Sequence, residues 1–379
     1  MFSTDVRMNP YWSPLVSRLQ PYTPGEQPQL EDFIKLNTNE NPLPPSPRVL
    51  AAITAELHRE GTEVGALRLY PDPQSLALKA ALAQRFDLNV DQVFVGNGSD
   101  EVLALSFPAL LLRDAGAPPL LVPDISYSFY TTYCRLYDVD YRSVPLAEDF
   151  SLCVEDYRQP ARSVIFANPN APTGLLLSLD QIRRLLEMKP TRLVVVDEAY
   201  IDFAGEAECT DALSAASCAP LVREYPNLLV VQTFSKGRSL AGLRVGYALG
   251  DASLIEAMER VKNSFNSYPL DRLAQVGALA SLEDDAHYQA VRQTQIQTRE
   301  QLASGLRALG FEVLPSSANF VFARHPACDA AKLFSGLRER RILVRHFQTE
   351  RIARFLRISV GTSTQCTLLC EALAELIKN

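Results

Sequence analysis

Between about residues 48 and 250 the chain alternates short, wholly apolar runs with longer segments of helical periodicity. The apolar runs are rich in Val, Ile and Leu, as is typical of strands that are covered on both faces of a parallel sheet. We expect such strands at residues 93–95, 120–122, 164–167, 193–196 and 228–232. Helices fit between them, including one that follows the capping box at Ser178 and Gln181 and one that begins near Ser99. The pattern predicts an α/β fold built from βαβ units.

After about residue 250 the predicted strands become shorter, which indicates a second and smaller α/β domain. Its expected helices span residues 286–309, 330–338 and a last segment to residue 378, and its expected strands span residues 311–314, 319–323, 342–344 and 355–360. The first 47 residues are rich in proline and polar groups, which favours an extended arm. We therefore predict three parts: an arm at residues 1–47 that joins the smaller domain, a large domain at 48–250, and a small domain at 251–379.

Composition narrows the possible functions of the chain. The 379 residues are 47% hydrophobic and 21% charged, as in ordinary globular proteins, and carry a net charge of −7. This acidity counts against nucleic acid and anionic membranes as partners. No apolar run approaches the ~20 residues of a membrane helix, and the first residues contain no signal-peptide core. The seven cysteines and four histidines are scattered without metal-ligand spacing, so we expect reduced thiols, no metal and a cytoplasmic location.

Polar and small residues follow four of the predicted strands, at the sheet edge where ligands bind in parallel α/β folds. The segments are Gly96-Asn97-Gly98-Ser99-Asp100-Glu101, Asn168-Pro169-Asn170-Ala171-Pro172-Thr173-Gly174, Asp197-Glu198-Ala199-Tyr200 and Thr233-Phe234-Ser235-Lys236-Gly237-Arg238. Taken singly, each has an ordinary explanation, respectively a capped turn, a loop, a helix cap and a solvated lysine. A carboxylate directly after three valines nevertheless needs a paired charge, because burying an unpaired charge is costly.

Together, the four segments contain the separate parts of a pyridoxal 5′-phosphate site. Amides at a helix N-terminus bind phosphate, amide side chains can reach a ring oxygen, and Asp197 suits a cationic ring nitrogen. Lys236 is followed eight residues later by Arg244, which suits a covalent amine beside a phosphate. A desolvated lysine near cations has a lowered pKa and attacks carbonyl groups.

The order and spacing of these motifs resemble the fold-type I aminotransferases over nearly the whole chain. Within that superfamily the chain is most similar to the histidinol-phosphate aminotransferases. The supporting segments are Gln20-Pro21-Tyr22, Leu36-Asn37-Thr38-Asn39-Glu40-Asn41-Pro42, Tyr70-Pro71-Asp72, Ser99-Asp100-Glu101, Ser126-Tyr127, Asp197-Glu198-Ala199-Tyr200, Phe234-Ser235-Lys236, Ala241-Gly242-Leu243-Arg244 and Leu356-Arg357-Ile358-Ser359-Val360-Gly361-Thr362. The resemblance implies a large domain with a mostly parallel central sheet covered by helices, plus a smaller α/β domain.

The resemblance also implies a ping-pong transamination that converts histidinol phosphate and 2-oxoglutarate to imidazole-acetol phosphate and glutamate, a step of histidine biosynthesis. By similarity, Lys236 forms the Schiff base with the cofactor and shuttles the proton, and Asp197 keeps the ring nitrogen protonated. Tyr200 is expected to bond the ring's 3′-oxygen, and Tyr127 to stack on the ring. The expected phosphate ligands are Ser99, Asp100, Thr233, Ser235, Arg244 and, from the neighbouring subunit, Tyr70. The chain is therefore expected to form a homodimer with shared active sites.

Substrate contacts are implied by similarity at five further positions. Arg357 matches the arginine that binds a substrate carboxylate in the superfamily, and one arginine fork can serve carboxylate and phosphate in turn. Arg345 and Tyr22 are expected at the distal phosphate, with Tyr22 able to act from the other subunit. Asn39 and Asn319 are the remaining expected substrate contacts, although a buried turn amide explains Asn319 equally well.

One position departs from the family pattern. The family places asparagine directly before Pro-Thr-Gly, where it bonds the 3′-oxygen, and this chain has Ala171 there. We expect Asn170 to take over that hydrogen bond, with Asn168 as the other candidate.

Three other functions remain open at this point. The first two are decarboxylation of threonine phosphate and transamination of aromatic or varied amino acids. A cofactor-binding regulator fused to a DNA-binding module is the third, and we do not expect it because no basic winged-helix segment precedes the domain.

Overall fold

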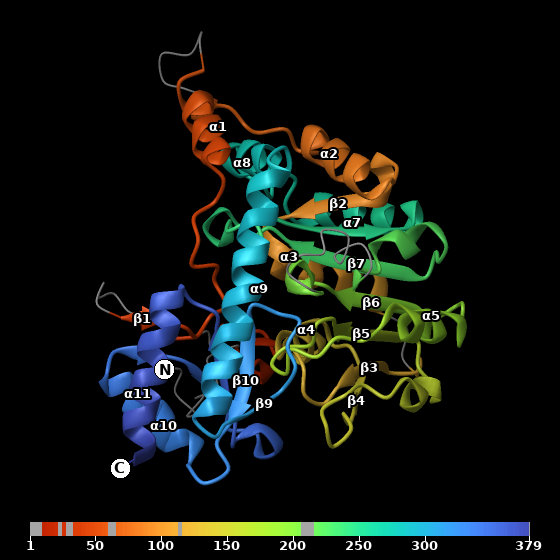
Figure 1. Ribbon diagram of the computed structural model, residues 1–379. Helices are drawn as coiled ribbons and strands as arrows, with labels where there is room; N and C mark the ends of the chain where they lie inside the picture. The colour runs from red at the N-terminus through yellow and green to blue at the C-terminus, as the bar shows by residue number, and fades with distance from the viewer. Residues whose placement is uncertain are drawn as a thin grey trace.

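The computed structural model describes residues 10–21, 25–27, 33–59, 66–112, 116–205 and 216–378. Within them a seven-stranded sheet has the order β2-β8-β7-β6-β5-β3-β4 (Figure 1). Its strands are β2 (Val93–Gly96), β3 (Leu120–Pro123), β4 (Tyr141–Val144), β5 (Ser163–Ala167), β6 (Leu193–Asp197), β7 (Leu228–Thr233) and β8 (Gly246–Gly250). Only β8 runs antiparallel to its neighbours, so the sheet is mostly parallel, as the sequence predicts.

Two of these strands, β4 and β8, were not expected from the sequence. Strand β4 lies at an edge, and three of its four residues are exposed, so no apolar run identifies it. Strand β8 begins and ends with glycine, a residue that weakens strands and usually indicates turns. The five strands that were expected are all present and wholly buried.

Helices cover both faces of this sheet. One face packs against α2 (Leu76–Phe86), α5 (Leu179–Glu187) and α8 (Arg272–Leu282), and the other against α3 (Gly98–Ser106), α4 (Phe129–Tyr137) and α7 (Ala252–Phe265). Consecutive strand residues alternate between the two cores: Val194 and Val196 lie in the first, and Val195 in the second. Since both faces are buried, the strands have the unbroken apolar sequences that made them recognisable.

The capping box predicted at Ser178 and Gln181 is present, and side-chain caps also begin other helices. Ser178 Oγ accepts a hydrogen bond from the amide of Gln181, and Gln181 Oε1 accepts one from the amide of Ser178, which is the capping box of α5. Helix α1 (Pro47–Leu57) begins with proline after Ser46, whose side chain accepts from the amide of Arg48 and donates to Asp284 Oδ2. That last bond ties the end of the arm to the start of α9 (Asp285–Ala308).

The second part of the chain contains a four-stranded antiparallel sheet with the order β12-β13-β10-β9. The strands are β9 (Glu312–Val313), β10 (Phe320–Arg324), β12 (Arg345–His346) and β13 (Leu356–Ser359). Helices α9, α10 (Ala330–Glu339) and α11 (Ser363–Lys378) pack on it. The arm contributes β1 (Ile34–Lys35), which pairs in parallel with β11 (Ile342–Leu343), and Leu36 lies in the same core.

The predicted domain limits stay a prediction, but the packing around residue 250 is informative. Helices α7 and α8 follow that residue and bury Met258 and Ala274 in the cores of the large sheet, and Leu270, between the two helices, is buried there as well. The long helix α9 then runs alongside both parts of the molecule (Figure 1). A search of the described residues finds no helix that is both long and apolar enough to cross a membrane.

Candidate active site

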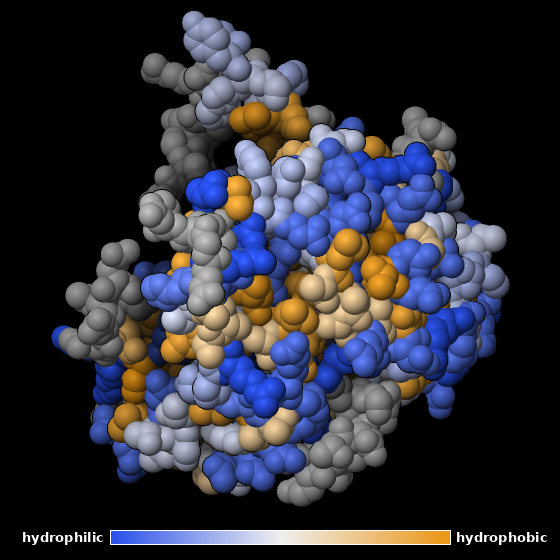
Figure 2. All heavy atoms as spheres, turned by 90° about the horizontal axis from the view of Figure 1, so that it is seen from above, coloured by the Kyte–Doolittle hydropathy of each residue, from blue (hydrophilic) through white to orange (hydrophobic). Residues whose placement is uncertain are grey.

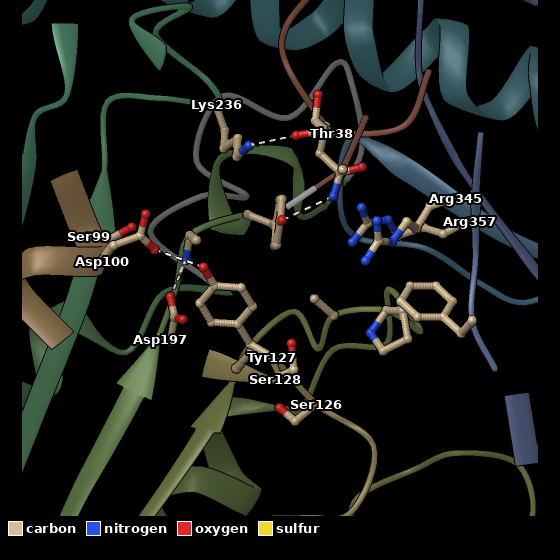
Figure 3. A pocket seen from close by; sticks show the side chains of 18 of the residues that line it. Thr38, Ser99, Asp100, Ser126, Tyr127, Ser128, Asp197, Lys236, Arg345 and Arg357 are labelled. Carbon is tan, nitrogen blue, oxygen red and sulfur yellow. Dashed lines mark hydrogen bonds between the residues drawn. The ribbon is translucent and has the colours of Figure 1, made fainter. Parts of the chain in front are cut away.

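A cavity of about 670 Å³ lies at the carboxyl ends of the large sheet's strands, where the small domain and the arm face them. The large domain lines it with residues that include Ser99, Asp100, Tyr127, Asp197, Tyr200, Thr233, Ser235, Lys236 and Arg244. The arm adds Thr38 and Asn39, and the small domain adds Arg345, Phe347 and Arg357. Figure 3 shows Asp100 and Asp197 at one end of this cavity, with Arg345 and Arg357 at the other.

Lys236 lies three residues after the end of β7 and reaches into the cavity. Its Nζ donates a hydrogen bond to the carbonyl oxygen of Thr38 at 3.2 Å and lies 5.8 Å from the centre of the Tyr200 ring (Figure 3). Burial, together with the positive charges of Arg357 and Arg244, lowers the pKa of Lys236 to about 8 against the opposing effect of Glu40 and Asp100. A lysine with this pKa is partly neutral near pH 7, so it can act as a nucleophile and as a base.

The backbone around Lys236 is also held closely. Asn41 Nδ2 donates to the Lys236 carbonyl at 3.0 Å, and the amide of Gly237 donates to Asp202 Oδ2 at 3.2 Å. A Cβ at residue 237 would lie 2.5 Å from the Asp202 carboxyl group, so glycine permits this approach.

Asp197 ends β6 and is almost fully buried. Its Oδ2 accepts a hydrogen bond from the hydroxyl of Tyr130 at 2.7 Å, and its Oδ1 accepts one from the amide of Ala199 at 3.1 Å. Burial raises the pKa of Asp197 to about 6, although both hydrogen bonds act to lower it. A buried carboxylate of this kind is suited to a cationic partner, because such a partner offsets the desolvation of its charge.

The N-terminus of α3, the start of β8 and the end of β7 meet beside these groups. Gly246 pairs with both Gly96 of β2 and Thr233 of β7, and a Cβ at 246 would lie 2.3 Å from the amide nitrogen of Ser99. The glycine therefore lets the strand pass close to the free amides of the helix. Such amides form an anion site.

Arg244 enters this site from the turn before β8. Its φ is +53°, in the left-handed region that non-glycine residues seldom adopt. The guanidinium donates to Asp100 Oδ2 at 3.2 Å and to Ser235 Oγ at 3.4 Å. The Thr233 hydroxyl donates to Ser235 Oγ at 3.0 Å, and Tyr127 donates to Asp100 Oδ1 at 2.8 Å. These amide, hydroxyl and guanidinium donors are the groups that bind phosphate.

Asn39 connects the arm to both domains. Its Nδ2 donates to the Tyr200 hydroxyl at 3.0 Å, its Oδ1 accepts from the Ser359 hydroxyl at 2.8 Å, and its amide donates to Ser359 Oγ at 2.8 Å. The residue has a φ of +56° and is 1% exposed, so these bonds hold it in an unfavourable backbone conformation. Tyr200 is thereby fixed with its ring against Phe320, edge to face at 5.1 Å.

Arg345 and Arg357 form the other end of the cavity. They are directly opposite each other in the β12–β13 ladder, and both guanidinium groups lie 5.8 Å from the ring centre of Phe347. Arg357 also donates to the carbonyl oxygen of Asn37 at 2.9 Å. Like charges opposite each other in a ladder repel, and an anion bound between them removes that repulsion. The pair is therefore suited to a carboxylate or a phosphate.

Two expected contacts are placed differently by the structure. Asn170 is not among the residues that line the cavity, because its Nδ2 donates to the carbonyl of Ile125 and to the Thr173 hydroxyl, while Ser126 donates to its Oδ1. Asn168 is likewise held by Leu177, so Ala171 alone of these three lines the cavity. These contacts keep Asn170 out of the cavity lining, so they do not support its expected role in place of the family asparagine, which stays a prediction.

Asn319 also lies behind the cavity wall. Its Nδ2 donates to the carbonyl oxygen of Asn39 at 3.0 Å, so it supports a lining residue without lining the cavity itself. Tyr70 is 77% exposed and stacks on Tyr268 outside the cavity of its own chain, and Tyr22 lies outside the described residues. Their expected roles across a dimer interface stay predictions.

Two contributions had no signal in the sequence. Tyr130 donates to Asp197 from α4, and nothing in its neighbourhood distinguishes it from a core tyrosine. Thr38 contributes a backbone carbonyl, a group that every residue has.

The chain is similar to known aminotransferases in both sequence and structure. Residues 31–373 match the family model of aminotransferase classes I and II. Histidinol-phosphate aminotransferase 1 of Methylococcus capsulatus is 57% identical over 98% of both chains, and the enzyme of Pseudomonas syringae pv. syringae is 56% identical over 97% of this chain and 100% of its own. The chain belongs to the histidinol-phosphate aminotransferases. The structure of the Sinorhizobium meliloti member has a TM-score of 0.84 at 26% identity, covering 97% of this chain and 98% of that one.

The cofactor of this family is pyridoxal 5′-phosphate, with which the Sinorhizobium enzyme was solved in complex. The donors present in this chain fit that group. An amine, a buried carboxylate and an anion site face one cavity, and the close approach at Gly246 leaves the Ser99 and Asp100 amides at its edge. Among the described residues, no group of three or more His, Cys, Asp or Glu side chains could hold a metal ion.

Proposed function

We propose that this chain interconverts histidinol phosphate and 2-oxoglutarate with imidazole-acetol phosphate and glutamate. The observation that carries the proposal is one cavity with two cationic ends and a lysine whose pKa responds to both, since Arg357 and Arg244 each lower it. One cationic end suits the phosphate of the cofactor. The other suits the phosphate of one substrate and the carboxylate of the other. Identity of more than half to relatives that bear this name supports the choice of substrates.

When bound, pyridoxal phosphate supplies an electron-withdrawing ring that stabilises negative charge at the substrate carbon. Asp197 would hold a proton on the ring nitrogen, and the hydroxyl of Tyr130 would keep the carboxylate directed there. Lys236 would bind the cofactor covalently and then, as a free amine, take a proton from the substrate at Nζ and return it. A pKa of about 8 suits that exchange, because both protonation states are populated near neutral pH.

The remaining cavity residues of the large domain would bind and orient the cofactor. The amides of Ser99 and Asp100, the hydroxyls of Thr233 and Ser235, and Arg244 would hold the cofactor phosphate. Tyr127 would pack on the ring, and Tyr200, fixed by Asn39, would bond its 3′-oxygen. Because Ala171 offers no side-chain donor, Tyr200 would be the principal side-chain donor to that oxygen.

Arg345 and Arg357 would bind the distal anion of each substrate in turn. The same pair would accept threonine phosphate, so the arginines alone do not exclude the decarboxylase alternative. An aromatic amino acid would pack against Phe347, so phenylalanine is the appropriate competing substrate.

We also propose a homodimer, with Tyr70 reaching the partner's cofactor phosphate. Tyr70 and Phe265 are 77% and 76% exposed, and Tyr268 supports Tyr70 by stacking at 4.6 Å between ring centres. Figure 2 views the end of the molecule at which α1, α2 and α8 lie, and hydrophobic residues gather there within a largely hydrophilic surface. Exposed apolar surface of this kind is typical of interfaces.

The deciding experiment is spectroscopic. Protein purified with pyridoxal phosphate should have a visible absorption band that bleaches on addition of histidinol phosphate or of glutamate. A band that bleaches with phenylalanine but not with histidinol phosphate would move the protein to the broad-specificity aminotransferases. Release of carbon dioxide from threonine phosphate would favour the decarboxylase.

A further inference from the structure

A hydrophobic cluster separate from the cores of the two sheets joins the two domains along one side of the cavity. Ile125, Leu146 and Phe150 come from the large domain, and Phe322, Ile352 and Phe355 from the small domain. The rings of Phe322 and Phe355 stack at 4.6 Å, and Phe150 meets Phe355 edge to face at 5.4 Å. Because Ile125 and Ile352 also line the cavity, this cluster forms part of the cavity wall where the two domains meet.

Arg351 crosses the domain boundary beside this cluster. It lies in the 3₁₀ turn Glu350–Ile352 of the small domain, and its Nη1 donates to Asp124 Oδ2 at 2.8 Å. Its Nη2 donates to the carbonyl oxygens of Leu146 and Ala147 at 3.0 and 2.9 Å. The guanidinium also lies 5.6 Å from the ring centre of Phe150. All four partners belong to the large domain.

The acceptor side of this contact is equally organised. Asp124 follows β3, lines the cavity, and uses its second oxygen to accept from the amide of Leu146 at 2.9 Å. The carboxylate therefore fixes the loop whose carbonyls also bind Arg351. The two side chains are 25% and 38% exposed, so the ion pair by itself contributes little to stability. Because the ion pair joins two domains, it affects how the small domain is held on the large one.

The segment that contains Arg351 also forms the substrate end of the cavity. Phe347, Thr349 and Ile352 line the cavity, and Arg345 begins the same segment. Strand β12 has only two residues, so its ladder to β13 supplies little restraint. The two arginines repel each other across that ladder, and a contact further along the segment helps to hold them in place.

We propose that Arg351 is a positioning residue that holds residues 345–352 of the small domain on the large domain and so sets the distance of the Arg345–Arg357 pair from Lys236. The proposal rests on the proposed function of that pair. Without Arg351, conformations in which the pair is displaced become more populated. The apparent affinity for both substrates then falls in proportion to the competent fraction, while the chemistry of the competent fraction is unchanged.

The test compares Arg351→Ala with Arg324→Ala in the holoenzyme. Arg324 is a matched control because, like Arg351, it lines a surface hollow beside Phe150 and Phe355. It pairs with Glu312 at 2.6 Å and lies 5.4 Å from the ring centre of Phe355, but both of these partners are in the small domain. Steady-state kinetics would give KM and kcat for histidinol phosphate and for glutamate, and inorganic phosphate would be measured as a competitive inhibitor. Hydrogen exchange would follow the amides of residues 349–355.

For Arg351→Ala we expect both KM values and the inhibition constant of phosphate to rise about tenfold, with kcat changed by less than about threefold. Exchange at residues 349–355 should accelerate. Arg351→Lys should recover part of the affinity, because a lysine can reach Asp124 but cannot also bind the two carbonyls as a fork. Arg324→Ala should leave all of these quantities near wild type.

The proposal would be overturned if Arg351→Ala and Arg324→Ala changed KM equally, or if Arg351→Ala lowered kcat and left KM unchanged. Asp124→Asn supplies a second variant for the same contact and should raise KM in the same direction. Absence of turnover of histidinol phosphate by the wild-type enzyme would contradict the proposed function. The measurements with glutamate would still decide the role of Arg351.

Discussion

The two ends of the cavity are built in different ways. The cofactor end is formed by Asp197, Lys236 and the amides of α3, which lie at or just beyond the ends of β6, β7 and β2. These strands belong to one sheet that is buried on both faces. At the substrate end, Arg345 and Arg357 stand on a short ladder of the small domain, and the arm and Arg351 hold that ladder from outside. The cofactor end is therefore rigid, whereas the substrate end depends on the contact between two domains.

The ends also differ in the groups that surround their charges. Arg244 donates to Asp100 Oδ2 at 3.2 Å, and Asp100 in turn accepts from Tyr127. Arg345 and Arg357 instead lie opposite each other in the β12–β13 ladder, and both lie over the ring of Phe347. Two adjacent guanidinium groups are suited to binding the anionic groups of different substrates in turn.

The largest effect that would sharpen the comparison comes from Lys236→Ala. Removing the amine should lower turnover by about 10⁴-fold or more and abolish the visible absorption band. Lys262 is a matched control because it is 3% exposed but pairs with Glu259 away from the cavity. Lys262→Met should keep the band, even if it lowers the melting temperature. Substantial turnover by Lys236→Ala would contradict the role of the lysine.

Asp197→Asn tests how much stability the cofactor end loses when the buried carboxyl group of Asp197 ionises. The unfolded carboxyl titrates near 3.8 and the folded one near 6, so the folded apoprotein binds the proton more tightly and loses stability as the pH rises between those values. Asparagine has no such titration. The stability of the variant relative to wild type should therefore increase from pH 4 to pH 7, by at most about 3 kcal/mol.

Chemical denaturation of the apoproteins at both pH values measures this difference. The same variant should bind pyridoxal phosphate more weakly, because the ring nitrogen loses its anionic partner. A stability difference that does not depend on pH would show that Asp197 is ionised at the same pH in both states.

Arg357→Ala tests the substrate end against the cofactor end. It should raise KM for histidinol phosphate and for glutamate by about 10- to 100-fold, the range expected for the loss of a hydrogen-bonded charge. The cofactor affinity should change little. Arg244→Ala should instead weaken the binding of pyridoxal phosphate and leave both KM values nearly unchanged. Titration of the apoprotein with pyridoxal phosphate measures the cofactor affinity. If either variant weakened both ligands equally, the two ends would not be separable.

The cofactor end of the cavity could be predicted from the sequence better than the contacts between distant segments. The buried strands and the residues at their ends were recognisable, because full burial gives unbroken apolar runs and the chemistry-bearing residues come directly after them. Strands β4 and β8 were missed, since one is exposed and the other is flanked by glycines. Sequence spacing therefore predicts that Asp197, Lys236 and Arg244 lie near one another, and all three line the cavity.

Contacts between distant segments could not be predicted in that way. Asn170 was expected in the cavity from its neighbours in sequence, but Ile125 and Ser126, some 45 residues earlier, bind its amide. The bond from Tyr130 to Asp197 and the bonds from Arg351 to the large domain likewise join residues whose side chains carry no local signal. Which of several equivalent polar groups faces a cavity depends on tertiary packing.

The smallest expected effect concerns one of these unforeseen contacts, the hydroxyl of Tyr130. Tyr130→Phe removes a hydrogen bond that lowers the pKa of Asp197, so that pKa should rise further. Loss of pyridoxal phosphate on acidification should then begin at a higher pH, and the affinity at pH 7 should fall by about fivefold, which corresponds to the ~1 kcal/mol of an ordinary hydrogen bond. Tyr133→Phe, in the same helix, removes a bond to the carbonyl of Asp100 and should leave the midpoint of this pH dependence in place. Absorbance titrations of both variants between pH 5 and 8 would separate a specific effect on Asp197 from general loosening of α4, and equal shifts in the two variants would favour the latter.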